Sequence, residues 1–143
     1  MAGGFREEIM RQVVRRLLPG QDLKAELINL ARINHIQSGC IISGVGSFTH
    51  ARVRTAAENG KETYVEWDEH MEIVSITGTI SEYGQHVHLS FSDINGNTYG
   101  GHLADGCRVF TVIEIVILIF DDMIFEREFD KLTGFKELKV SNK

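Results

Sequence analysis

The sequence has 143 residues, the size of one ordinary domain with its own hydrophobic core. Hydrophobic residues make up 43% and charged residues 24%, which indicates a globular protein and excludes a disordered or collagen-like chain. The formal net charge of −5 excludes a generally basic nucleic-acid-binding protein, because phosphate binding requires clustered cations. Cys40 and Cys107 are too few for a disulfide framework, and we expect two buried free thiols, because each follows a glycine in apolar sequence.

No targeting or membrane-spanning segment is predicted. The first 20 residues include Arg6, Glu7 and Arg11, which leaves no apolar core for a signal peptide. The longest apolar run, residues 109–120, contains Glu114 and is shorter than the roughly 20 apolar residues that a membrane helix needs. We therefore interpret this run as a buried strand, and we expect an intracellular, cytoplasmic protein that does not bind membranes.

The first elements in chain order are one ambiguous segment and one clear helix. Residues 11–18 fit either a helix or a strand, and Pro19-Gly20 ends the element in both cases. Residues 22–34 are predicted to be a helix, because Asp22 is suited to the N-cap and three leucines then recur at helical spacing.

After the helix, the pattern favours strands. The predicted strands are residues 40–42, 51–56, 63–67, 72–80, 85–91, 99–103 and 108–120. Asn59-Gly60 and Asn95-Gly96 are hairpin signals, whereas Gly44 and Gly46 lack the third glycine of a dinucleotide-binding loop and indicate a bend in a strand. The chain is therefore predicted to be an α+β domain, mainly antiparallel β-sheet with one main helix packed on it.

Three histidines stand out as candidate metal ligands: His86, His88 and His102. Because side chains alternate along a strand, His86 and His88 share one face of residues 85–91, about 7 Å apart at Cα. The other face of this strand is mostly apolar. Paired imidazoles on a strand can present two nitrogen ligands to Zn²⁺ or another divalent transition metal.

The place of His102 depends on the register of the hairpin at Asn95-Gly96. A two-residue turn would put His102 opposite Leu89, on the apolar face. One additional residue, in a three-residue loop or a bulge, would put it opposite Ser90 and diagonal to His88, on the face of the other two histidines. We predict this irregular register, because two glycines directly precede His102 and glycines accommodate bulges.

Two interpretations of the three histidines remain open on the residues alone. They could be hydrogen-bonded polar groups on a solvated face, or they could hold a metal with one coordination position open, as in catalytic zinc sites. The role of Glu114 also remains open, because a carboxylate in an apolar strand is energetically costly unless it is paired. It could be a general base or a hydrogen-bond partner of a histidine ligand, or it could pair with an arginine such as Arg127 or point outward at a sheet edge.

A series of motifs also runs through nearly the whole chain in a fixed order. They are Leu18-Pro19-Gly20-Gln21-Asp22-Leu23, Gly44-Val45-Gly46-Ser47, residues 72–80, residues 84–90, Gly100-Gly101-His102-Leu103, Gly106-Cys107, Glu114-Ile115-Val116-Ile117, residues 125–130 and Thr133-Gly134-Phe135. Together these motifs resemble the plant-and-prokaryote-conserved (PPC) domain.

The resemblance implies a fold, an assembly and a site. The fold would be a single PPC domain over residues 1–143, related to acetolactate decarboxylase, and the assembly would be a homotrimer. His86, His88 and His102 match the family's three-histidine metal site, which is usually described as zinc. Plant members carry AT-hooks, and prokaryotic members are often labelled DNA-binding. This chain has no Arg-Gly-Arg-Pro hook, and it has Glu69-His70-Met71 where plant members have Gly-Arg-Phe.

We therefore expect a zinc-binding homotrimer whose first candidate function is a metal-dependent small-molecule enzyme of unassigned reaction, with Glu114 moving the proton. The alternative is a DNA-binding or transcription-regulatory protein. A third candidate is a trimer that only scaffolds partners, with residues 109–120 lining its interface.

Overall fold

The computed structural model describes residues 11–143, and the charged stretch around Arg6 and Glu7 lies outside them. The elements in chain order are β1 (Arg11–Leu17), α1 (Leu23–Ile33), β2 (Gly39–Arg54), β3 (Tyr64–Trp67), β4 (Met71–Ser81), β5 (Gly84–Ser92), β6 (Thr98–Leu103), β7 (Arg108–Ile119), β8 (Met123–Phe129) and β9 (Lys136–Asn142). No helix within residues 11–143 has both the length and the apolar character that crossing a membrane requires.

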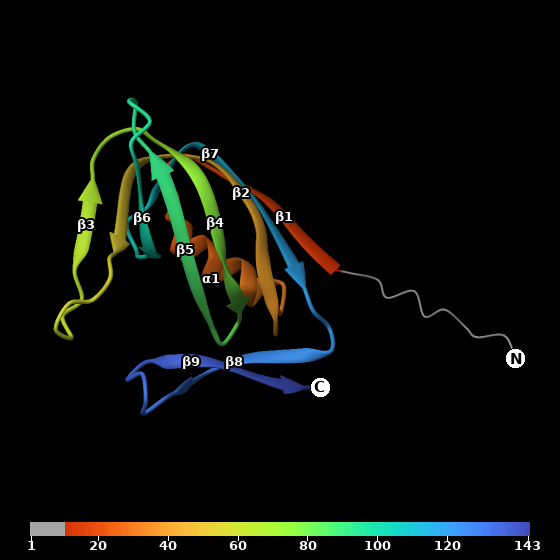
Figure 1. Ribbon diagram of the computed structural model, residues 1–143. Helices are drawn as coiled ribbons and strands as arrows, with labels where there is room; N and C mark the ends of the chain where they lie inside the picture. Colours follow the sequence, from red (N-terminus) through yellow and green to blue (C-terminus); the bar gives the residue numbers. More distant parts are fainter. Residues whose placement is uncertain (1–10) are drawn as a thin grey trace, which may run out of the picture.

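The strands from β1 to β7 form one sheet whose paired strands are all antiparallel. Its order is β1-β7-β2-β4-β5-β6, with β3 paired to the end of β2. β6 also pairs with β2, so the sheet curves back on itself, and α1 lies against its inner side (Figure 1). This arrangement confirms the predicted α+β fold with one main helix packed on an antiparallel sheet.

The predicted helix is confirmed together with its N-cap. The carboxylate of Asp22 accepts a hydrogen bond from the backbone N–H of Ala25 at 3.0 Å, which satisfies one of the free donors of the first turn. Leu23 and Leu27 are fully buried against the sheet. The helix therefore contributes the apolar layer that closes the core on the inner side of the sheet.

Two segments of the sheet resolve points that the sequence left open. The segment at residues 11–18 proves to be a strand up to Leu17, because β1 pairs along its whole length with β7. The two strands predicted on either side of Gly44 and Gly46 are one long strand, β2. The register of β2 against β7 shifts between Gly46 and Phe48, which confirms the predicted bend.

The C-terminal hairpin of β8 and β9 forms a second, two-stranded sheet that the secondary-structure analysis missed. It crosses one end of the main sheet (Figure 1). The backbone carbonyl of Phe125 accepts from the hydroxyl of Ser81 at 2.6 Å, and its N–H donates to the carbonyl of Gln37 at 2.8 Å. The hairpin is therefore fastened to the rest of the domain through its backbone.

Both cysteines are free thiols, as predicted, but only Cys107 is buried, whereas Cys40 is partly exposed. Burial raises the pKa of the Cys107 thiol to about 11. Its sulfur donates to the carbonyl of Arg52 at 3.2 Å. Cys107 is therefore a protonated core residue at neutral pH.

Candidate metal centre

Strand β5 separates an apolar face from a histidine face, as its alternation predicts. Val87, Leu89 and Phe91 are at most 4% exposed and lie in the core. His86 and His88 are exposed on the opposite face, which points away from α1. One strand thus supplies both core packing and two ligand-bearing side chains.

His102 lies on the histidine face, as predicted, but its partner is different from the one predicted. It pairs directly with His88, and Ser90 pairs with Gly100. The predicted position opposite Ser90 is therefore wrong. The direct pairing places the imidazole of His102 closer to His88 than a diagonal position would.

The reason is the loop between β5 and β6. Asp93 pairs with Asn97, because its N–H donates to the carbonyl of Asn97 at 3.0 Å, so the loop consists of residues 94–96 rather than Asn95-Gly96 alone. The carboxylate of Asp93 also accepts from the N–H groups of Asn95 and Asn97, at 2.9 Å each. The additional loop residue is Ile94, on the β5 side, and it moves the whole of β6 by one position.

The glycine pair before His102 does not form the predicted bulge. The register of β5 and β6 continues without a shift from Ser92–Thr98 to His88–His102. A Cβ on Gly101 would lie 2.6 Å from the carbonyl oxygen of Arg54. Glycine is therefore needed for the close approach of β6 to β2.

The three imidazoles converge on one point. Their candidate ligand nitrogens all lie within 4.8 Å of one another, and Nε2 of His86 is 3.1 Å from Nε2 of His88. The ring centroid of His102 lies 5.1 Å from that of His86 and 5.4 Å from that of His88. This spacing suits three nitrogen ligands around one ion, since zinc–nitrogen bonds are about 2.0–2.1 Å long.

The surroundings favour neutral imidazoles, the form that binds metals. Burial, together with the positive charge of Arg54, lowers the pKa of His102 to about 4. Burial and the neighbouring His88 lower the pKa of His86. The electron pairs of these rings are therefore free of protons at neutral pH.

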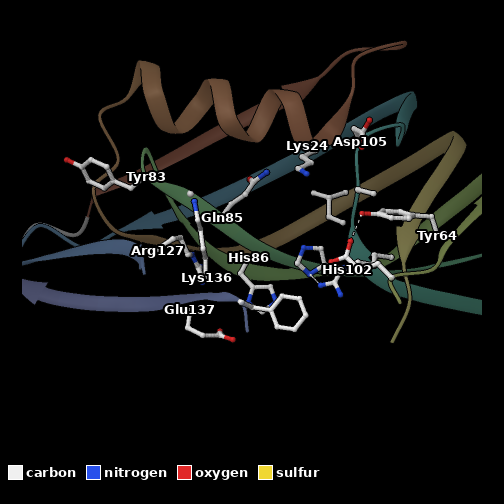
Figure 2. Close-up of a pocket in the computed structure, with 16 residues that line it drawn as sticks. Lys24, Tyr64, Tyr83, Gln85, His86, His102, Asp105, Arg127, Lys136 and Glu137 are labelled. Carbon is white, nitrogen blue, oxygen red and sulfur yellow. Dashed lines mark hydrogen bonds and ion pairs between the residues drawn. The ribbon is translucent and has the colours of Figure 1, made fainter. Parts of the chain in front are cut away.

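A cavity of about 580 Å³ opens beside the histidines (Figure 2). His86 and His102 form part of its wall, and cationic side chains line much of the rest. They are Lys24, Arg54, Arg127 and Lys136. Arg54 lies directly beside the site, because its Nη2 is 3.3 Å from Nδ1 of His102.

The structure does not bring Glu114 to the histidines within one chain. Glu114 lies on β7, where it is exposed and pairs with Arg16 on one side and Val45 on the other. It is absent from the cavity wall. Arg127 is not its partner either, since the guanidinium of Arg127 donates to Oγ1 of Thr79 at 2.7 Å.

The cavity arginines are the functional candidates that sequence reasoning missed. Arg54 meets His102 through the pairing of β2 with β6, which joins residues 48 positions apart. Arg127 reaches the site from the C-terminal hairpin. Neither contact has a local signal in the sequence; the only trace is the motif at residues 125–130, which the family resemblance includes.

Comparisons with known proteins agree with this fold. The Plants and Prokaryotes Conserved (PCC) domain, the PPC domain of the sequence analysis, matches residues 5–121. A curated Synechococcus protein, the bifunctional protein GlmU, is 41% identical over 125 residues, which cover 87% of this chain and 19% of that protein. The chain thus spans about a fifth of the length of the curated relatives that it matches.

Solved structures match nearly the whole chain. A hypothetical protein from Salmonella enterica has a TM-score of 0.88 and 32% identity, with 96% of this chain and 98% of that chain covered. A metal-containing protein from Archaeoglobus fulgidus has a TM-score of 0.81 and 25% identity, with 95% and 98% covered.

A more distant likeness confirms the predicted fold relation. Acetolactate decarboxylase from Bacillus subtilis has a TM-score of 0.53 and 17% identity, with 76% of this chain and 52% of that chain covered, a likeness of fold alone. The family match and the full-length structural likeness agree with the motifs of the sequence: the chain belongs to the Plants and Prokaryotes Conserved domain family.

Proposed function

We propose that the chain is a metal-binding protein in which His86, His88 and His102 hold one divalent transition metal ion, with zinc as the first candidate. The observation that carries this proposal is the convergence of three ligand nitrogens within 4.8 Å of one another. Neutral imidazoles suit zinc, nickel and copper, and three of them leave a position for a further ligand. The Archaeoglobus fulgidus protein, described as metal-containing, supports the proposal.

The cavity favours a small-molecule role for this site over a purely structural one. A structural zinc site is closed by four protein ligands, whereas this cluster has three and opens into a cavity of about 580 Å³. A metal here would supply Lewis-acid polarisation of a ligand oxygen. We therefore propose a metal-dependent enzyme or small-molecule binder of unassigned reaction. Glu114 is not included as a general base, because within one chain it lies outside the cavity.

We further propose that the chain assembles as a homotrimer through the outer face of the sheet. Val14 and Val45 are each 57% exposed on the strands that flank β7. The β-sheet register places both on the same face as Glu114 and Val116. Apolar side chains on the solvent side of a sheet are typical of a surface that a second copy covers.

Metal analysis tests the central proposal. The chain, purified without a histidine tag, is incubated with zinc, dialysed and analysed for metal content. We expect about one ion per chain. A content below a few tenths of an ion per chain would contradict the proposal. Light scattering on the same samples tests the trimer, and a mass of 16.1 kDa, that of a single chain, would contradict it.

DNA association is the alternative function. The net charge of −5 gives it little support, because non-specific DNA affinity comes from phosphate contacts. A fluorescence anisotropy titration at roughly 50 mM and 200 mM salt separates the two functions. Binding that weakens steeply with salt would favour DNA association, and no binding at the lower salt would reject it.

A further inference from the structure

The cavity beside the histidines contains positive charge that the carboxylates in its wall compensate only in part. Lys24, Lys136 and Arg127 form no ion pair with any residue in the range 11–143. Arg54 has one weak pairing, 4.0 Å from its Nε to Glu62. The other two carboxylates in the cavity wall form no ion pair with these cations: Asp105 pairs with Arg52 at 2.8 Å, and Glu137 keeps its charge while it accepts a hydrogen bond from a threonine hydroxyl at 2.8 Å.

Arg127 is the most constrained of these cations. Its stem lies across Gly84, where an added Cβ would be 2.8 Å from Cγ of Arg127. Its Nη2 donates to Thr79, which pairs with His86 across the β4–β5 ladder. Burial lowers the pKa of Arg127, with Glu137 acting in the opposite direction. A half-buried guanidinium, fixed beside the histidines without a carboxylate partner, is the group that proteins use to hold oxyanions.

Arg54 has a different relation to the site. A neutral imidazole has one nitrogen that accepts a hydrogen bond, and in His102 the nitrogen that faces Arg54 is Nδ1, at 3.3 Å. If the electron pair of this ring is given to a metal, the other nitrogen carries the proton and cannot accept from a guanidinium. Ligation by His102 therefore releases the Nη2 donor of Arg54 toward the cavity.

Gln85 also belongs to the cavity wall, but its amide is closed off from the cavity. The amide nitrogen and oxygen are both buried and have no hydrogen-bond partner within residues 11–143. A ligand would reach these atoms only if the side chain of Gln85 turned, so the case for an anion site rests on the two arginines.

We propose that this cavity binds a small organic molecule through an oxyanion, a carboxylate or a phosphate group, with Arg127 as the fixed anchor and Arg54 as a second donor that becomes available when His102 binds metal. The role of Arg54 rests on the proposed metal site, whereas the role of Arg127 does not. Arg127 and Lys136 come from the β8–β9 hairpin, whereas Arg54 comes from the end of β2.

The test measures the affinity for two probes, inorganic phosphate and succinate, by calorimetry on metal-free protein and on dialysed, zinc-loaded protein. The main variant is Arg127→Gln, which keeps the stem that packs on Gly84. The matched control is Lys139→Gln, which removes the same charge from an exposed position on β9 outside the cavity. The second variant is Arg54→Gln. Metal analysis and circular dichroism accompany every sample.

We expect millimolar or tighter binding of at least one probe, and the stronger probe assigns the oxyanion to the carboxylate or the phosphate class. Arg127→Gln should weaken binding about 10–100-fold in both forms, with zinc content unchanged, and Lys139→Gln should have no effect. Arg54→Gln should lower the affinity of the zinc-loaded form more than that of the metal-free form.

Three outcomes would overturn the proposal. They are no binding of either probe at millimolar concentration, equal affinity in Arg127→Gln and wild type, and an equal loss in Lys139→Gln. If Arg54→Gln lowered the probe affinity equally in metal-free and zinc-loaded protein, metal binding by His102 would not free Arg54 to bind the anion. A protein that takes up no zinc would refute the metal site alone, because the metal-free measurements on Arg127 would still decide the oxyanion site.

Discussion

The two faces of β5 have opposite chemistry although their residues alternate along a single strand. Phe91 and Val87 are buried in an apolar layer with α1, and their positions are fixed by packing. His86 and His88 point to the other side, where both are exposed and most of the side chains in the adjoining cavity wall are polar or charged. The difference indicates that burial of the core face supplies most of the stability of this strand. The histidine face contributes little to stability, so its side chains can serve a ligand.

The largest expected effect of a substitution is on the core face. Phe91→Ala should lower the free energy of unfolding by about 3–5 kcal/mol. The reason is that Phe91 is fully buried and its ring lies 5.1 Å from that of Trp67 and 6.2 Å from that of Phe48. Chemical denaturation measures the change.

The matched control on the other face is Ser90→Ala, which removes one hydrogen bond, 2.9 Å long, to Ser75. It should cost no more than about 1 kcal/mol. If Ser90→Ala destabilised the protein as much as Phe91→Ala, the histidine face would contribute as much to stability as the core face, which would contradict this comparison.

The second effect is on metal affinity. His88→Gln should weaken zinc binding by at least about 10–100-fold, the range already seen when only a supporting contact of a metal ligand is lost. The unfolding free energy of the metal-free protein should change by less than about 0.5 kcal/mol, because His88 is exposed. Competition with a chelating dye measures the affinity.

His70→Gln is the matched control, since His70 is exposed and pairs with Glu72 at 3.0 Å outside the cluster. Normal zinc affinity in His88→Gln, or an equal loss in His70→Gln, would show that zinc binds elsewhere on the chain.

The third effect concerns the outer face of the sheet beyond the histidines. Val45→Lys should convert the proposed trimer into single folded chains, because a charge in the middle of an apolar interface is costly to desolvate. Ile94→Lys is the control: Ile94 is 93% exposed in the β5–β6 loop, and the same change there should leave the assembly intact. Light scattering separates the two results, and an unchanged mass in Val45→Lys would place the interface on another surface.

The same comparison explains what the sequence could predict. Alternation along β5 is local, so the core residues and the shared face of His86 and His88 could be predicted from residues 85–91 alone. The partner of His102 could not, because it depends on the hydrogen bonds of Asp93, which lengthen the loop by one residue. The alternation of side chains within each strand does not indicate the length of the loop between them, so it cannot predict the register.

Contacts between distant segments were beyond local patterns for a related reason. Arg54 and His102 meet only because β6 pairs with two strands at once, and Gly101 is needed for that approach. The β8–β9 hairpin was missed because the middle of β8, Glu126 to Glu128, is charged. The buried side chain of this strand is Phe125. Its place is set by backbone hydrogen bonds to Gln37 and Ser81, which no side-chain periodicity records.

The smallest expected effect concerns Glu114, which the strand register places on the same outer face of the sheet as His86. Glu114→Gln should leave the zinc content unchanged and alter the unfolding free energy by less than about 0.5 kcal/mol, because Glu114 is exposed and forms no ion pair with residues 11–143. Zinc titration and chemical denaturation measure both quantities. A tenfold loss of zinc affinity would instead mean that another copy of the chain brings this carboxylate to the histidines, since within one chain β2 and β4 lie between β7 and β5. The variant therefore decides whether the site is complete in one chain or is shared across the proposed trimer.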